Sequence, residues 1–245
     1  MRKYLVLAWL LLPLPVLVFH FGRRGQEWLA RDIAHDLIHE AKQAEARGDW
    51  KAADGKYSEA DKVVGASDPS LKLRLDLARV QTRYRMGDAV PAIDAVDHLL
   101  EDAALATMPQ DFQREVRELS GRIHYYAAWV MRLEGADREL WMEEADRSRQ
   151  SYRLLAEGSP ADTPSTKVRS EREDLEAAVQ LQRLSLTELM ARPLPQEGRS
   201  MSGQGLTEQM GKRRGQRGNK PGPGKGEGPP GPGGGIQRFK PGEGS

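Results

Sequence analysis

Apolar residues recur at helical spacing from Arg24 to Arg192, and this pattern limits the fold of the chain more than any other feature. No stretch in this range alternates apolar and polar residues between hairpin dipeptides, as strands do. Short connections divide the range, for example at Asp68-Pro69, where Asp68 is expected to cap a helix. Because short connections make neighbouring helices pack antiparallel, we predict an all-α fold. The predicted helices are about seven and span residues 24–47, 50–65, 70–86, 88–104, 110–134, 137–157 and 165–191.

The segment from residue 34 to 69 places small and aromatic residues around a glycine turn. Gly48 occupies the turn, and the small side chains of Ala41 and Ala53 let two helices approach closely. In this pattern the segment resembles a tetratricopeptide repeat. The residues that carry the resemblance are Leu37, Ala41, Ala44, Gly48, Asp49, Trp50, Ala53, Tyr57, Ala60 and Pro69.

A second copy of the pattern follows 39 residues later, at Gly87 and Ala92. Its first helix departs from the pattern, because Asp76 and Arg79 stand at positions that are normally apolar. A third copy is suggested by Gly121, Tyr125, Trp129, Gly135 and Tyr152. The resemblance implies an array of antiparallel helix pairs, since one repeat cannot bury its apolar face alone. The helix at 165–191 would then cap the array, or alternatively support self-association or docking of a partner.

The resemblance also implies a concave groove, lined by the first helix of each pair, in which ligand peptides lie. Matched by position, the groove candidates of the first unit are His35, Ile38, Lys42 and Glu45. Those of the second unit are Arg74, Leu77, Gln81, Tyr84 and Arg85. The basic residues among them would suit an acidic peptide or one that ends in a carboxylate.

The N-terminal residues 4–21 form an apolar run of eighteen residues with basic pairs on both sides. As a helix this run is about 27 Å long, which is just enough to cross a lipid bilayer. We predict a signal anchor over residues 1–23 that contacts the bilayer through residues 4–21. A cleaved signal peptide is less favoured because no small-x-small site follows the run, and a buried soluble helix is the remaining alternative. The short N-terminal flank favours a cytoplasmic N-terminus, so the helical domain at 24–192 would be periplasmic, attached to the inner membrane.

The C-terminal residues 193–245 are predicted to be a disordered, basic tail. Sixteen of the 25 glycines fall after residue 197, and large apolar residues are scarce there. The tail's basic patch consists of Lys212, Arg213, Arg214, Arg217 and Lys220. Residues 198–245 carry nine Lys and Arg against three Glu, a net charge of +6. Because residues 1–21 carry +2 and the whole chain +1, the middle of the chain carries −7. The tail therefore serves as a spacer or binds an acidic partner, which includes the helical body itself.

The sequence offers little for catalysis. Cysteine is absent, which excludes disulfides, thiolate metal sites and cysteine nucleophiles. His35 and His39 share one helix face, but no third metal ligand is evident nearby, and no phosphate-binding loop or nucleophile elbow occurs. The aromatic group Tyr125, Tyr126, Trp129 and Trp141 fits either a core or an exposed binding platform. We therefore expect no enzyme activity, no metal and no cofactor.

These observations favour a membrane-anchored adaptor or scaffold that binds protein or peptide partners at the bacterial cell envelope. The alternative is a cytoplasm-facing helical domain whose basic tail binds RNA or ribosomes. With the N-terminus in the cytoplasm the tail lies outside it, so nucleic acid is the less favoured partner.

Overall fold

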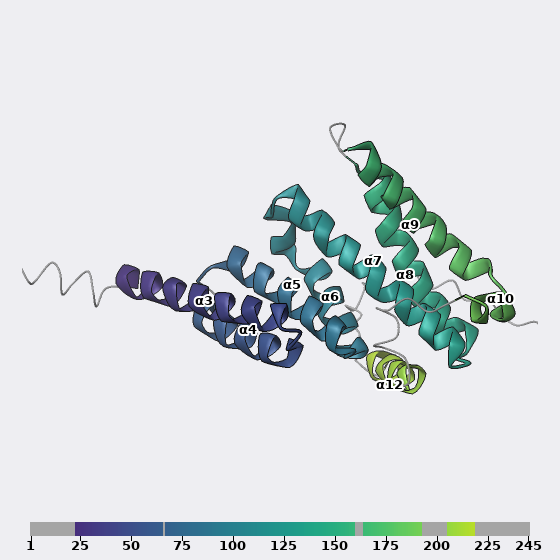
Figure 1. Cartoon of the computed structure of the whole chain (residues 1–245), viewed down its shortest axis with the longest axis horizontal. Helices are drawn as coiled ribbons and strands as arrows, with labels where there is room; N and C mark the ends of the chain where they lie inside the picture. Colours follow the sequence, from purple (N-terminus) through teal and green to yellow (C-terminus); the bar gives the residue numbers. More distant parts are fainter. Residues whose placement is uncertain (1–22, 66, 160–163, 193–204, 219–245) are drawn as a thin grey trace, which may run out of the picture.

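The computed structural model describes residues 23–65, 67–159, 164–192 and 205–218 (Figure 1). These residues contain helices and no strand, so the all-α prediction is confirmed. The helices are α3 (Arg23–Ala46), α4 (Trp50–Val64), α5 (Pro69–Met86), α6 (Ala89–Glu101), the short 3₁₀ helix η1 (Ala103–Thr107), α7 (Gln110–Leu133), α8 (Arg138–Glu157), α9 (Ser165–Arg183), α10 (Leu186–Met190) and α12 (Leu206–Gly218). No helix within the described residues is long and apolar enough to cross a membrane. The apolar run at 4–21 lies outside the described residues, as does Lys220 of the basic patch.

The predicted helices correspond to α3 through α9, with two differences. The helix expected at 88–104 ends at Glu101 and is followed by η1. The helix expected at 165–191 breaks at Leu184, and α10 starts afresh after Ser185. The Ser185 hydroxyl accepts from the Glu188 amide, while the Glu188 carboxylate accepts from the Ser185 amide. This reciprocal pair satisfies two helix-end donors, and it stabilises a new helix start in place of a continuous helix. Asp68 caps α5 as predicted, by accepting from the Leu71 amide at 3.0 Å.

Three connections, from α3 to α4, α5 to α6 and α7 to α8, share one turn. Their glycines are Gly48, Gly87 and Gly135, with φ of +73°, +87° and +76°. In each turn the glycine amide donates to the carbonyl three residues earlier, and the next amide donates to the carbonyl five residues earlier. This pattern terminates a helix and reverses the chain, and it requires a residue without a side chain at positive φ. The chain therefore forms three helical hairpins that follow one another.

Consecutive helices pack side by side, with α3 and α4 at one end of the row and α8 and α9 at the other (Figure 1). One apolar cluster joins α3, α4 and α5. A larger cluster joins α5, α6, α7 and α8, and residues of α9, α10 and α12 also belong to it. Of the predicted repeat-packing residues, Ala41, Ala53, Tyr57, Ala60 and Ala92 are buried, Leu37 packs against the first cluster, and Trp50 is half-buried beneath Arg85.

The polar residues of α5 that depart from the repeat pattern form ion pairs with α4 or within α5. Arg79 contacts Asp54 at 3.4 Å and Asp61 at 3.5 Å. Asp76 accepts from Lys72, which also reaches Asp61. These side chains are half-buried, so their ion pairs add to the apolar contact that Leu75 makes between the two hairpins.

The structure corrects the predicted disorder of residues 193–245 over residues 206–218, which form α12. This helix packs against α6, α7 and α8, where Leu206, Met210 and Arg213 are buried. Two backbone amides at its start, those of Leu206 and Thr207, donate to the Glu134 carboxylate at 3.3 and 2.8 Å. A negative charge at a helix N-terminus stabilises the helix. Three buried anchors at helical spacing and this cap outweigh the glycines of the segment.

Two mid-helix glycines provide a test of the contact between α7 and α8. A Cβ on Gly121 would lie 2.9 Å from Cε1 of the buried Tyr152, whereas a Cβ on Gly55 of α4 would meet nothing within 4 Å. We expect Gly55→Ala to raise the free energy of unfolding by about 0.5–1 kcal/mol, through helix propensity. Gly121→Ala is expected to lower it by about 1–3 kcal/mol, because the Tyr152 ring must move. Urea unfolding measures both, and equal stabilisation by the two changes would contradict the close α7–α8 approach.

Candidate functional site

A groove begins between α3, α5 and α7, as a pocket of about 400 Å³. Seven of the nine groove candidates line it: His35, Ile38, Lys42, Glu45, Arg74, Leu77 and Gln81. They come together because α3 and α5 are the first helices of successive hairpins and stand on the same side of the row. Phe112 and Glu115 of α7 complete the lining, and neither was among the candidates.

The floor of this pocket is apolar, and its rim carries two cations. Leu75, Leu77 and Phe112 are buried, and Arg74 lies over the Phe112 ring at 5.3 Å. Within the described residues neither Lys42 nor Arg74 forms an ion pair, although both are exposed. The groove thus presents two cations that are not ion-paired, although Glu45 and Glu115 line the same pocket.

The two carboxylates of the pocket already have donors. Glu115 accepts from the Gln81 amide at 3.3 Å. Burial and the neighbouring Glu45 raise the pKa of Tyr57, as expected when a phenol donates to a carboxylate. The donors of the groove are therefore left for a ligand that carries acceptors.

The groove continues along α5 and α7 into a second pocket of about 370 Å³, which shares Gln81 and Glu115 with the first. Tyr84 and Arg85, the remaining two groove candidates, line this second pocket. A third pocket of about 410 Å³ shares Glu118 and Arg122 with the second and reaches α9. Four helices, α3, α5, α7 and α9, thus line one side of the row.

Sequence reasoning missed the α7 residues of the groove. Phe112, Glu115, Glu118 and Arg122 lie 23, 20, 17 and 13 residues before Gly135, whereas the candidates of the first two hairpins lie at most 13 residues before Gly48 or Gly87. Extending the spacing of the first two hairpins to the third would have indicated Arg122, Tyr125 and Trp129, which line the third pocket. It would not have indicated Phe112, Glu115 or Glu118, for which the sequence carries no signal.

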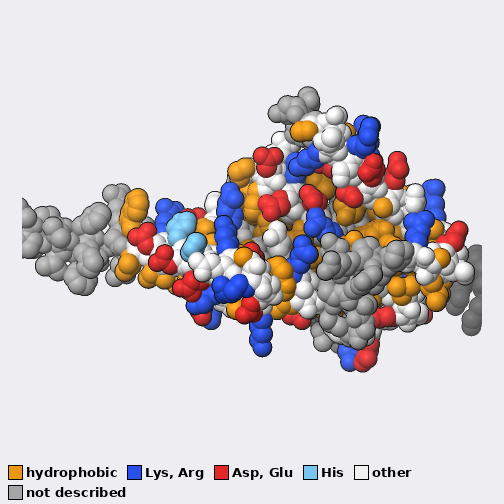
Figure 2. Space-filling model, in the orientation of Figure 1, with side chains coloured by type: hydrophobic (Ala, Val, Ile, Leu, Met, Phe, Trp, Pro, Cys, Tyr) orange, Lys and Arg blue, Asp and Glu red, His pale blue; other side chains and the backbone are white. Residues whose placement is uncertain are grey.

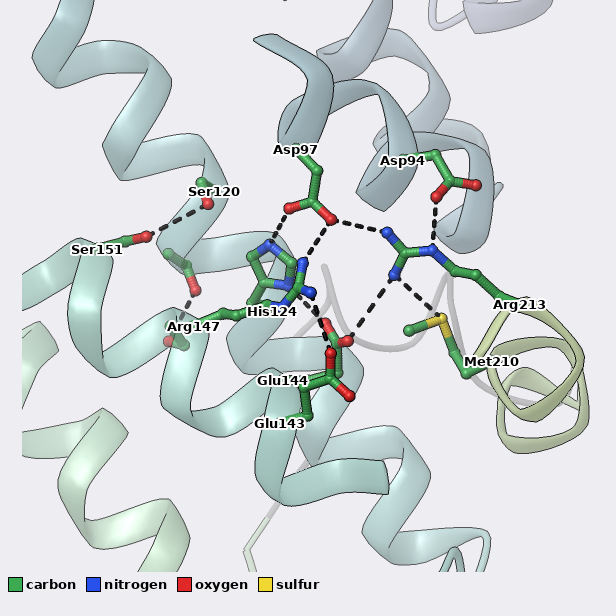
Figure 3. Close-up of polar contacts among 12 residues, drawn as sticks. Asp94, Asp97, Ser120, His124, Glu143, Glu144, Arg147, Ser151, Met210 and Arg213 are labelled. Atoms are coloured by element: carbon green, nitrogen blue, oxygen red, sulfur yellow. Dashed lines mark hydrogen bonds and ion pairs between the residues drawn. The ribbon is translucent and has the colours of Figure 1, made fainter. Parts of the chain in front are cut away.

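A network of buried charges lies on the α6 side of α7, around His124 (Figure 3). The His124 ring is 1% exposed, with Nδ1 at 2.5 Å from Glu144 and Nε2 at 3.2 Å from Asp97. Asp97 also binds Arg147 at 2.5 Å and Arg213 at 2.7 Å. Asp97 lies on α6, His124 on α7, Glu144 and Arg147 on α8, and Arg213 on α12, so the network joins these four helices. Sequence analysis gave His124 and Asp97 no role.

Arg213 shows what the basic patch of the tail contacts. Its guanidinium donates to Asp94 at 2.5 Å and to Asp97, and lies 3.9 Å from Glu144 (Figure 3). These acidic groups belong to the helical body, and the side chain of Arg213 is 9% exposed. Arg213 is therefore part of the core, not of a solvated patch.

The network has a pH dependence with a definite sign. Burial alone would lower the pKa of His124, but Glu144 and Asp97 raise it above its ordinary value of 6.5. Two carboxylates accepting from both ring nitrogens require the protonated ring. A pKa that is higher in the folded state adds stability below pH 6.5, and this stability is lost as the pH rises through the folded value.

We expect the free energy of unfolding to fall by up to about 1.4 kcal/mol per pH unit across that window. Urea unfolding at a series of pH values measures it, and NMR titration of His124 locates the folded pKa. Glu144→Gln should lower the NMR midpoint. A His124 midpoint at or below 6.5 in the unmodified chain would contradict the assignment.

Comparison with protein-family models, curated proteins and solved structures found no match for this chain.

Proposed function

We propose that the chain is a membrane-anchored adaptor that binds an acidic segment of a partner protein in the groove along α3, α5 and α7. The observation that carries this proposal is the pair of cations Lys42 and Arg74, which stand unpaired over an apolar floor. Acidic or terminal carboxylates complement such cations, while the floor accepts an apolar side chain between them. The partner is bound and not chemically altered.

The tetratricopeptide-like arrangement is part of the same proposal. It is supported by the three hairpins that share one glycine turn and by the groove on the side of their first helices. In an array of this kind each hairpin adds to one continuous surface. An extended peptide is therefore the ligand shape that we propose.

Membrane attachment is supported by the start of α3. Trp28, Leu29 and Ile33 are 64%, 57% and 42% exposed there, a few residues after the apolar run at 4–21. Exposed Trp and Leu next to an apolar segment suit the membrane interface. With the N-terminus inside, the groove would face the periplasm.

The RNA-binding alternative is less well supported, because the described part of the basic patch is engaged with acidic residues. Lys212 pairs with Glu208 at 2.6 Å, Arg213 is buried among carboxylates, and Arg214 lies 3.8 Å from Glu139. On the face drawn in Figure 2, acidic and basic side chains are interspersed. A nucleic-acid surface usually concentrates basic charge on one face.

The proposal is tested with the full chain in detergent and two fluorescein-labelled peptides of equal length, one acidic and apolar, the other basic and apolar. Fluorescence anisotropy should show binding of the acidic peptide only. The double change Lys42→Glu with Arg74→Glu should weaken this binding by about 100-fold, since it replaces two attractive charges by two repulsive ones. Lys62→Glu, on the exposed side of α4, is the matched control and should leave binding unchanged.

Two results would overturn the proposal. One is binding of neither peptide, and the other is an equal loss in the Lys62→Glu control. A reporter fused after Ser245 tests the topology separately, because activity in the cytoplasm alone would contradict a periplasmic groove.

A further inference from the structure

The third pocket of the groove differs from the first in being aromatic. Rings of Tyr125, Tyr126, Trp129 and Tyr152 line it, together with Ser170, Asp174 and Ala177 of α9. Tyr125 meets Tyr126 and Trp129 edge to face, with centroids 5.3 and 5.6 Å apart. Faces of aromatic rings carry partial negative charge and attract cations.

A carboxylate without a cation partner stands beside these rings. Asp174 is half-buried, and among the described residues it accepts no hydrogen bond and forms no ion pair. Burial raises its pKa, and the nearby Glu118 adds to the effect. An aspartate in such a position is less stable in its charged form than it would be in water.

The cations near this pocket do not satisfy Asp174. Arg122 lies close enough to lower the pKa of Asp174 partly, but its guanidinium donates to Glu118 at 2.7 Å. Arg192, at the end of α10, acts on the pKa of Tyr125 and forms no ion pair with a described residue. The pocket therefore combines aromatic faces with a carboxylate that lacks a counter-charge, which is the chemistry that recognises an ammonium or guanidinium group.

We propose that the pocket between α7 and α9 binds a lysine or arginine side chain of the same peptide whose acidic group binds at Lys42 and Arg74. This inference rests on the proposed function and adds the charge pattern of the ligand. The ligand is an extended segment with an acidic group at the α3–α5 end and a basic group at the α7–α9 end.

The geometry of α7 sets the spacing between the two groups. Glu115 lines the first pocket and Tyr126 the third, and both lie on α7. Eleven residues of helix span about 16 Å. An extended peptide covers this length in about five residues. The acidic and basic groups of the ligand are therefore expected to be about five residues apart.

The pocket is tested directly with N-acetyl-argininamide, added to the full chain in detergent with ¹⁵N-labelled tryptophan. Trp129 lines the pocket, and its indole N–H signal is identified by its loss in Trp129→Phe. We expect its signal to shift with N-acetyl-argininamide and not with N-acetyl-leucinamide. Asp174→Asn should abolish the shift, while Glu173→Gln, an exposed neighbour on α9, should keep it. No shift with the arginine probe, or a shift that survives Asp174→Asn, would overturn the pocket assignment.

The shared ligand is tested with three labelled peptides that carry an acidic group alone, or an acidic and a basic group separated by about five or about two residues. The five-residue spacing should bind about tenfold more tightly than the acidic peptide. Asp174→Asn should remove this gain and leave the acidic peptide unaffected. Because Asp174 is held in an unfavourable charged state, Asp174→Asn should not lower the melting temperature, which separates a binding role from a structural one.

The failures of the two proposals are distinguishable. Binding of the acidic peptide without any response to the arginine probe overturns the cation pocket alone. A response to the arginine probe without binding of any peptide overturns the proposed function and, with it, the shared ligand.

Discussion

Replacing Asp97 by Ala is expected to lower the free energy of unfolding by about 3–5 kcal/mol, because it removes one partner of a buried ionic network. The Asp97 carboxylate contacts His124, Arg147 and Arg213. Burial alone would raise the pKa of Asp97, but His124, Arg147 and Arg213 outweigh burial and place this pKa well below its ordinary value. Without Asp97 three cationic groups remain in or near the core with less negative charge to balance them.

Asp94→Ala is the matched control. Asp94 lies three residues earlier on α6, binds the same Arg213 at 2.5 Å, and its side chain is 42% exposed. An exposed pair contributes about 0.2–1 kcal/mol, so the control should lose at most this amount. Urea unfolding of both variants provides the comparison, with an unchanged m-value showing that the denatured state is the same. If both variants lost the same free energy of unfolding, burial of Asp97 would not be the reason for the stabilising effect of the network.

The same variants report on α12. Since Arg213 anchors α12 through Asp97 and Asp94, amide hydrogen exchange in residues 206–215 should accelerate in Asp97→Ala before the rest of the body unfolds. Uniform acceleration along the whole chain would indicate that α12 and the body unfold as one unit.

The hairpins could be predicted from sequence because their determinants are local. Gly48 and Gly87 supply the positive φ that the turns need, and Ala41, Ala53 and Ala92 mark close helix contacts. The groove candidates followed from position relative to these turns, and the structure brings all nine to one groove. Such determinants act within one hairpin, so they can be recognised without knowledge of contacts between distant parts of the chain.

The position of α12 could not be predicted, because its determinants are distant in sequence. Leu206, Met210 and Arg213 share a helix face, but two apolar residues among many glycines fall short of the periodicity that indicates a buried helix. An arginine in a basic run normally lies in solvent. Only the acidic residues of α6 and α8, more than 60 residues away, make burial of Arg213 favourable.

Replacing Arg114 by Ala is the other change with a large expected effect, a loss of about 3–5 kcal/mol in the free energy of unfolding. Arg114 is buried in α7 and donates to Glu171 of α9 at 2.5 Å and to the carbonyl of Gly158 at 3.0 Å. It thereby satisfies carbonyls at the end of α8 and holds α9 against α7. Burial alone would raise the pKa of Glu171, but the hydrogen bonds from Ser159 and Arg114 lower it.

Arg117→Ala, one turn further along α7, is the control. Among the described residues Arg117 makes one hydrogen bond, to the carbonyl of Gln113 at 3.3 Å, so its loss should cost no more than about 1 kcal/mol. Pairing Arg114→Met with Glu171→Leu should recover most of the stability, since an apolar pair leaves no uncompensated charge. A double variant as unstable as Arg114→Ala would show that the carbonyls of α8, not the charge of Glu171, determine the loss.

Loss of the Arg114 contacts should also change the groove, which distinguishes the role of this residue from that of Asp97. Glu171 lies three residues before Asp174 on α9, so a loosened α9 no longer holds Asp174 opposite Tyr125 and Trp129. The Arg114→Ala variant is studied without urea, at a temperature where the chain is still folded. Under these conditions the Trp129 response to N-acetyl-argininamide should weaken. Binding of the acidic peptide at Lys42 and Arg74 should persist, because α3 and α5 do not contact α9 across the first pocket. If both responses were lost together, the two ends of the groove would form one cooperative unit, and the ligand's acidic and basic groups would not bind independently.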